Sequence, residues 1–273
     1  MLERRALYSF YDTVQNLSNI KVGGLQSLIF GNPLVAKMQD HPVQTSSGVS
    51  SAGDMAIIQV SGILTKSPGS MEAEMLGLCD TDEISMALDE AVNDASVRSI
   101  VMAFNSPGGD TVGIAELGRK IKDIDTNIKP IYAWTETGMN SAAYWLGSQA
   151  RLIGMTESAA ILSCGVYMIV LDASNKYKEE GVNPQVIAAE SSPHKMLGHD
   201  MKPLTLEEKD YLQQDVNRQH QSFIDVVKES RPDIKDEALT GRSYEGREAF
   251  SMGAVDIVVD DFDSFLEEIT DQQ

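Results

Sequence analysis

The sequence is poor in cysteine, and this sets the first limit on what the protein can be. Cys79 and Cys164 are its only two cysteines, and they lie far apart in the chain. A disulfide framework or a zinc site needs several thiols at short, regular spacing. We therefore expect neither a disulfide nor a zinc site, and the composition fits a reducing compartment.

Basic residues are also scarce. The chain has 22 Lys and Arg against 41 Asp and Glu, a formal net charge of -19. Nucleic acid and anionic membranes would repel such a chain at long range, so we expect a protein partner or substrate instead. No apolar run reaches the length of a membrane span, and the first ten residues lack the apolar core of a signal peptide. These features predict a cytoplasmic protein.

The remaining composition is that of a globular chain. With 273 residues, 42% hydrophobic and 23% charged, it can form one large domain with an appendage. Residues 1–38 show no strong hydrophobic period, and a stretch rich in Ser and Gly, 41–54, follows them. We therefore predict an N-terminal arm and linker over residues 1–45 and the main domain over 46–273.

Strands and helices alternate through the middle of the chain. We expect an apolar strand over residues 55–60 and a helix capped by Asp80. A second strand, 99–104, leads through glycines into an amphipathic helix, and a third, 131–135, leads to a helix that begins near Ser141. The alternation predicts an α/β fold, with the loops after the second and third strands converging on one crevice.

The second half of the chain is less regular. We expect strands over residues 152–155 and 166–171 and a helix over 173–180. Thr205 and Glu208 have the spacing of a capping box and open a helix of about 25 residues that ends before a proline.

Ser141 is the first candidate for a catalytic residue. It follows Gly138 and Asn140, which suit a sharp turn, and it precedes an apolar helical stretch. Unpaired backbone N–H groups in the first turn of a helix favour developing negative charge, which places a serine there well for nucleophilic attack. The alternative is that Ser141 only caps the helix, as most serines in that position do.

Gly108 and Gly109 follow the second strand directly. Paired glycines let the backbone approach a ligand closely, so their N–H groups suit an oxyanion or a phosphate. The loop lacks the lysine and the Ser or Thr of a nucleotide-binding loop, so an oxyanion hole or a simple turn remains. We expect no cofactor.

A base for Ser141 is expected in the loop of residues 190–203. A lysine accepts a proton near neutral pH only if burial lowers its pKa from about 10.4 by several units. The pattern leaves four candidates open: His194, Lys195, His199 and Lys202.

Five short motifs stand in a fixed order along the chain. They occupy residues 104–109, 141–145, 163–166, 195–198 with 203–205, and 241–242 with 248–249 and 253–256. Together they resemble the signal peptide peptidase A family of serine-lysine peptidases over residues 55–260. Within that family the chain is most similar to the prohead (head-maturation) proteases of tailed phages.

The resemblance implies a Clp-protease/crotonase-like fold of repeated ββα units. It implies that Ser141 is the acylating nucleophile, that Lys195 is its general base, and that the N–H groups of Gly108 and Gly109 form the oxyanion hole. It further implies an extended or unfolded polypeptide substrate, such as a phage scaffold or capsid protein. Family members with single-length chains form homo-oligomeric rings in which the serine of one subunit meets the lysine of its neighbour, so the resemblance implies such a ring here.

The chain departs from the family pattern at two places. Leu162 and Cys164 stand where relatives usually have a glycine and an isoleucine, and residues 193–194 replace a glycine-containing approach to Lys195. The backbone near the base is therefore expected to differ.

Three other functions stay open at this point. The chain resembles signal-peptide-degrading peptidases as well, here without a membrane anchor. A crotonase-type acyl-coenzyme A enzyme would share the fold but would leave Ser141 and Lys195 without a role. A non-catalytic capsid-assembly factor would use the arm of residues 1–45.

Overall fold

The computed structural model of the chain describes residues 49–68 and 76–270. The predicted arm and linker, residues 1–45, lie outside the described residues. The described chain divides into two compact units. We call them the sheet unit, residues 49–68, 76–165 and 220–270, and the 166–219 unit.

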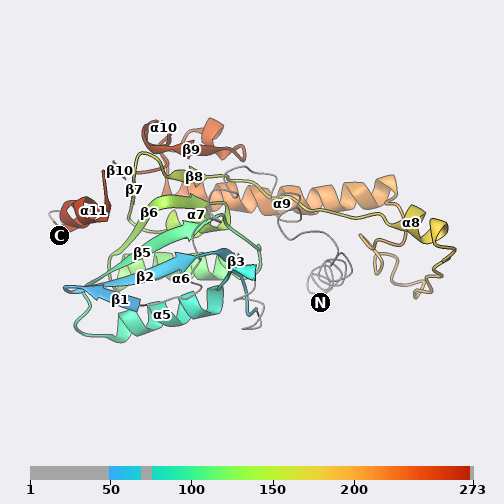
Figure 1. The fold of residues 1–273 in the computed structure, drawn as a ribbon, viewed down its shortest axis with the longest axis horizontal. Helices are drawn as coiled ribbons and strands as arrows, with labels where there is room; N and C mark the ends of the chain where they lie inside the picture. Colours follow the sequence, from blue (N-terminus) through green and yellow to red (C-terminus); the bar gives the residue numbers. More distant parts are fainter. Residues whose placement is uncertain (1–48, 69–75, 271–273) are drawn as a thin grey trace. The chain divides into compact units, whose positions relative to one another are not determined.

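The sheet unit is built on an eight-stranded sheet (Figure 1). All neighbouring strands are parallel except the β1–β2 and β8–β9 pairs. The main path runs β1 (Val49–Ala52), β2 (Met55–Ser61), β5 (Ser99–Ser106), β6 (Ile131–Asn140), β7 (Leu152–Met155) and β10 (Ile257–Val258). Two strands lie off this path: β8 (Ala160–Leu162), which pairs with β6, and β9 (Ser243–Glu245), which pairs with β8. A separate two-stranded sheet is formed by β3 (Ile63–Thr65) and β4 (Leu78–Asp80).

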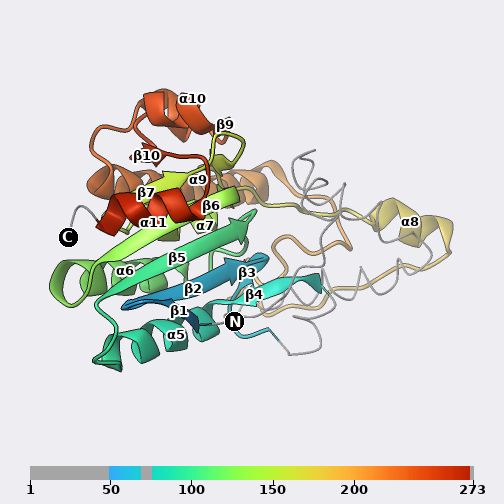
Figure 2. The same ribbon diagram turned by 60° about the vertical axis from the view of Figure 1, so that its left-hand side comes forward.

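Helices cover both faces of this sheet (Figure 2). Those of the sheet unit are α5 (Thr81–Asn93), α6 (Ile114–Asn127), α7 (Ala142–Gly147), the 3-10 helix η2 (Asp236–Leu239), α10 (Gly246–Ser251) and α11 (Phe262–Thr270). The 166–219 unit contains α8 (Ser174–Glu179), and α9 (Leu206–Ser230) begins there and ends in the sheet unit.

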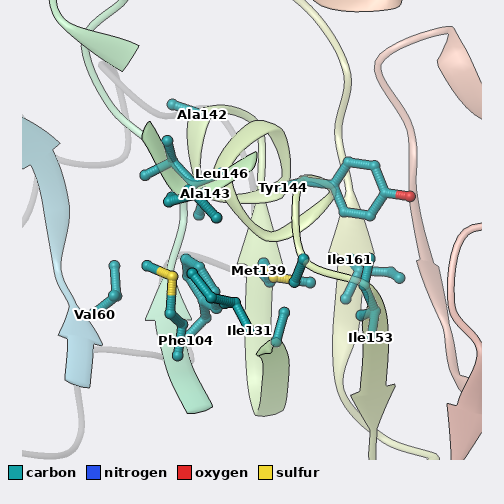
Figure 3. Packing of buried hydrophobic residues seen from close by; sticks show 14 of the residues in the cluster. Val60, Phe104, Ile131, Met139, Ala142, Ala143, Tyr144, Leu146, Ile153 and Ile161 are labelled. Carbon is teal, nitrogen blue, oxygen red and sulfur yellow. The ribbon is translucent and has the colours of Figure 1, made fainter. Parts of the chain in front are cut away.

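Alternating strand residues build two separate cores, because successive side chains of a strand point to opposite faces. On β5, Met102 and Phe104 enter the larger core with α5, α6 and α7, whereas Val101 and Ala103 face the smaller core. Figure 3 shows part of the larger core, in which strand residues pack beneath α7. In the smaller core, Phe265 of α11 stacks on Trp134 with ring centroids 4.9 Å apart.

The predicted α/β class and its alternating units are confirmed. The Asp80 carboxylate accepts a hydrogen bond from the backbone N–H of Asp82 at 2.8 Å, which caps α5 as the sequence predicts. The capping box of α9 is also present, because Glu208 N–H donates to Thr205 Oγ1 at 3.2 Å and Thr205 N–H to Glu208 Oε2 at 2.9 Å.

The third strand is longer than predicted. Instead of turning at Gly138, β6 continues to Asn140, and its register with β5 shifts from Ala103↔Trp134 to Asn105↔Gly138. The extra β6 residues bulge out, and the strand then pairs with β8 as well as β5. This second partner, which the sequence pattern does not reveal, carries the strand up to Ser141.

The predicted strand over residues 166–171 is wrong, since the structure assigns no strand between residues 163 and 173. Residues 166–219 include no buried side chain. Backbone and side-chain bonds organise this unit: Ala173 N–H donates to the Asp200 carbonyl at 2.8 Å, and Tyr177 OH to Asp200 Oδ2 at 3.0 Å. Within residues 49–68 and 76–270, no helix has both the length and the apolar character needed to cross a membrane.

Candidate active site

Ser141 lies between the end of β6 and the start of α7. Its φ of 51° and ψ of -123° are rare for a residue with a side chain. Its N–H donates to the Leu162 carbonyl at 2.6 Å, and its carbonyl accepts from Trp145 N–H at 3.0 Å. Two backbone bonds on opposite sides therefore hold the serine in this conformation.

The Ser141 hydroxyl does not cap α7, so the simple N-cap interpretation is not supported. Within the described part of the chain, no protein group hydrogen bonds to this hydroxyl, and the residue is partly exposed. By contrast, the buried Ser106 and Ser148 donate to the carbonyls of Gly62 and Trp145, each at 2.7 Å. Of these three serines, Ser141 has the hydroxyl available for chemistry.

The glycine loop after β5 packs directly against Ser141. Gly108 has a φ of 101°, and a Cβ built on it would lie 2.6 Å from Ser141 Cβ and 2.9 Å from the Asn140 carbonyl oxygen. Only a residue without a side chain fits there without displacing the serine. The two loops that the sequence predicts to converge do meet at one point.

Strand β3 fixes the other side of this loop. Leu64 N–H donates to the Gly108 carbonyl at 2.9 Å, and Asp110 N–H donates to the Leu64 carbonyl at 2.8 Å. Gly108 N–H lies 3.2 Å from Ser106 Oγ and donates to it. Gly109 N–H has no hydrogen-bond acceptor among the described residues, and so it can donate to a ligand.

The third side of the site is the end of β8. Leu162 and Ser163 both have positive φ, at 89° and 50°, and Ser163 N–H donates to the Arg242 carbonyl at 2.9 Å. A leucine at this φ is strained, whereas glycine is not. The backbone conformation at Leu162 is therefore one that favours glycine.

The sequence pattern does not reveal that the side chains of Asn140 and Ser243 meet at this edge. Ser243 Oγ donates to Asn140 Oδ1 at 2.9 Å. The two residues are 103 positions apart. Asn140 is visible in the sequence as the residue before Ser141, but no pattern links it to Ser243.

Cys164 is buried beside this edge and carries a free thiol. Burial raises the pKa of the Cys164 thiol far above its ordinary value. The thiolate is the nucleophilic form, so Cys164 is not a competing nucleophile.

Lys195 belongs to the 166–219 unit, and its side chain is exposed. Its N–H donates to the Ser192 carbonyl at 3.1 Å, within a series of turns. Ser141 belongs to the sheet unit, so the pairing of Lys195 with Ser141 stays a prediction.

The rival bases have neighbours of their own within the 166–219 unit. Lys202 Nζ lies 2.5 Å from Glu208 Oε1, and the hydrogen bond from Lys202 lowers the pKa of Glu208. His194 stacks on Tyr211 with ring centroids 5.3 Å apart. His199 Nδ1 lies 2.8 Å from Asp200 Oδ1. The Lys202 amine is thus already paired with a carboxylate, which makes it a less available base for Ser141.

Comparison with known proteins decides the family. Residues 124–271, more than half of the chain, match the model of peptidase family S49. The chain belongs to peptidase family S49. This match begins within α6 and includes the Ser141 turn, β8 and β9.

Relatives of this S49 chain include an archaeal protein and two phage proteins. A protein of Methanocaldococcus jannaschii named as a protease is 31% identical over 63% of this chain and 55% of its own length. The head-tail preconnector protein GP5 of Enterobacteria phage P21 is 26% identical over 77% of this chain and 42% of its own. The capsid assembly protease C of Escherichia phage lambda is also 26% identical, over 77% of this chain and 47% of its own length. The chain thus spans about half the length of these relatives.

Solved structures give a weaker likeness. Methylmalonyl CoA decarboxylase in complex with 2S-carboxypropyl CoA aligns with 82% of this chain and 73% of its own, at 14% identity and a TM-score of 0.45.

Proposed function

We propose that the chain is a serine endopeptidase that uses Ser141 as nucleophile and Lys195 as general base. The observation that carries this proposal is the unengaged hydroxyl of Ser141, held at positive φ against the backbone of Gly108. Membership of family S49 supports a peptidase.

The proposed reaction proceeds through an acyl-enzyme. Lys195 Nζ, unprotonated, accepts the Ser141 hydroxyl proton as Oγ bonds to the carbonyl carbon of the substrate. The carbonyl oxygen becomes an oxyanion that accepts hydrogen bonds from the glycine loop. The peptide C–N bond then breaks, and Lys195 returns the proton to the leaving amine. A water molecule then takes the place of the amine. It gives a proton to Lys195 as its oxygen bonds to the ester carbon, and Ser141 Oγ leaves and takes that proton back from Lys195.

Gly109 N–H is the more available of the two proposed oxyanion donors. It is free to donate, whereas Gly108 N–H already donates to Ser106 Oγ over a long 3.2 Å. An oxyanion-hole donor contributes about 2.7–4 kcal/mol to transition-state stabilisation. Gly108 would join as a second donor if the substrate oxyanion replaces Ser106 as its acceptor.

The Lys195 side chain is exposed within a single chain, yet a lysine works as a base only when burial disfavours its charged form. The 166–219 unit also holds nine of the thirteen exposed large hydrophobic side chains of the described residues. Contact with a neighbouring subunit would bury the Lys195 side chain and would also cover these hydrophobic side chains. We therefore propose a homo-oligomeric ring in which Lys195 of one subunit serves Ser141 of the next.

The proposed substrate is extended or unfolded polypeptide. Two relatives are named as a phage head-tail preconnector protein and a phage capsid assembly protease. Scaffold or capsid proteins in a phage prohead, or in the cytoplasm of its host, are therefore the proposed substrates.

The test is covalent labelling with a serine-directed phosphonate probe, followed by mass spectrometry of the peptides. We expect a single adduct on Ser141, and Ser141→Ala should abolish both labelling and cleavage of an unfolded protein substrate. Ser251→Ala is the matched control, because that exposed hydroxyl only donates to the Glu248 carbonyl on α10. Labelling of Ser163 in place of Ser141 would identify Ser163 as the nucleophile. The absence of any adduct would reject the proposal.

A further inference from the structure

The side chain of Asn140 links its own strand, β6, to β9, which is not a neighbour of β6 in the sheet. Its Nδ2 donates to the Ala160 carbonyl of β8 at 3.2 Å, and its Oδ1 accepts from Ser243 Oγ of β9 at 2.9 Å. The β8 strand lies between β6 and β9, so this side chain ties the end of β6 across β8 to β9. Both ends of the amide are engaged.

The bridge lies beside three of the four described non-glycine residues that have a positive φ. Ser141, Leu162 and Ser163 have φ values of 51°, 89° and 50°, and Ser141 N–H bonds to the Leu162 carbonyl. Residues in such conformations persist only where the surrounding structure holds them. Asn140 directly precedes Ser141, and its ladder partner is Leu162, whose own partner on β9 is Ser243.

The bridge is not needed to join the strands themselves. β6 pairs with β8 through three residue pairs, and β8 pairs with β9 through another three. What the side-chain bonds add is a restraint on the last residue of β6, from which the backbone turns into the Ser141 conformation. A restraint there limits the position of the backbone from which the Ser141 side chain projects.

We infer that Asn140 and Ser243 form a positioning pair that orients Ser141 for attack on the substrate carbonyl. The inference rests on the proposed function, and neither residue is assigned contact with substrate. The pair acts on the rate of the acylation step, since misplacing a nucleophile by about 1 Å can cost 100-fold in rate.

The test is the kinetics of phosphonylation by the same serine-directed probe, which separates the rate constant of modification from probe affinity. We expect Asn140→Ala to lower the rate constant about 10- to 100-fold and Ser243→Ala to lower it about 3- to 10-fold. Probe affinity should be unchanged, and every molecule should be labelled at the end point. Ser243→Thr, which keeps the hydroxyl, should restore the rate.

Three comparisons separate positioning from a merely structural role. The double variant should react no more slowly than Asn140→Ala alone, because the two side chains act as a unit. A structural role would instead lower the labelled fraction or the melting temperature and leave the rate per labelled site unchanged, which would overturn the inference. Asn127→Ala and Ser251→Ala are matched controls at exposed positions of α6 and α10.

Ser243→Ala keeps the test decisive should Asn140→Ala fail to fold, because an unchanged rate in that variant also overturns the inference. The wild-type chain separates this result from the proposed function. A labelled wild type with unaffected variants rejects only the positioning pair. An unlabelled wild type rejects the proposed function and the pair with it.

Discussion

Gly108 and Ser141 leave no room between them for a side chain, since a Cβ on Gly108 would lie 2.6 Å from Ser141 Cβ. The contact joins the loop after β5 to the turn after β6. It also sets the position of Gly109, whose free N–H follows directly along the chain. The spacing of these residues is therefore fixed by backbone packing rather than by side chains.

Replacing Gly108 with alanine should eliminate labelling of Ser141 while most of the fold is retained. The new methyl group must displace either Ser141 or the glycine loop, and the positive φ adds about 1–2 kcal/mol of strain. Loss of labelling is measured by mass spectrometry, and the fold by circular dichroism.

Gly53→Ala is the control for that substitution. Gly53 also has a positive φ, 65°, but a Cβ there would meet no atom within 4 Å. This variant should lose about 1–2 kcal/mol of stability and keep full labelling. Equal labelling of the two variants would show that Ser141 does not need the close contact with Gly108 to react with the probe.

Leu162→Gly should destabilise the protein even though it relieves backbone strain. Glycine at a φ of 89° recovers about 1–2 kcal/mol, but removing a fully buried leucine side chain costs about 2–5 kcal/mol. The packing loss is larger, so the free energy of unfolding should fall by roughly 1–3 kcal/mol in urea titrations. Increased stability would mean that the strain at Leu162 outweighs its packing.

Much of the sheet unit could be predicted from the sequence because its signals are local. The large apolar residues of α6 have the spacing of one helical face, and all of them are buried: Ile114, Leu117, Ile121 and Ile124. Asp80 and Thr205 cap the helices that their spacing predicts. The convergence of Gly108 with Ser141 follows from the geometry of parallel strands, whose carboxyl ends meet at one edge.

The sequence pattern fails to predict those parts of the structure that depend on partners distant in sequence. The apolar run at residues 166–171 has the composition of a strand, but a strand also needs a neighbour with which to pair, and the described chain supplies none. The extension of β6 depends on β8, and the Asn140 bridge depends on Ser243. Hydrophobic periodicity carries no information about such pairings.

The two cysteines should resist thiol reagents in the folded protein. Burial is the main reason that the pKa of Cys79 is raised from 9.0 to about 12. At pH 8 a thiol-specific reagent should react very slowly with the native chain and rapidly with two thiols in urea. Fast reaction of the native chain would show that the core around Cys79 opens readily.

The raised pKa of Cys79 also predicts that the free energy of unfolding falls at alkaline pH. The folded state keeps the Cys79 proton to higher pH than the unfolded state does, so the contribution of Cys79 to stability is fully present below pH 9.0. It is lost as the pH rises toward about 12. Cys79→Ala should therefore show a shallower alkaline loss of stability than the wild-type chain in unfolding titrations over this range.

The proposed sharing of each active site between two subunits leads to the last prediction, a test that mixes two inactive variants. Ser141→Ala chains retain Lys195, and Lys195→Ala chains retain Ser141. If each site combines the serine of one subunit with the lysine of its neighbour, random co-assembly of equal amounts leaves about a quarter of the sites complete. Peptide cleavage by the mixture should then reach about a quarter of the wild-type rate per site, while each variant alone stays inactive.

Co-assembly itself must be verified, for example by differently tagged chains that purify together and by the mass of the assembly in solution. Denaturing and refolding the mixture allows subunits to exchange, and the same treatment of each variant alone is the control. A co-assembled but inactive mixture would place both residues of each site in one chain. An active wild-type monomer would exclude a shared site, because Lys195 would then have to reach Ser141 within a single chain.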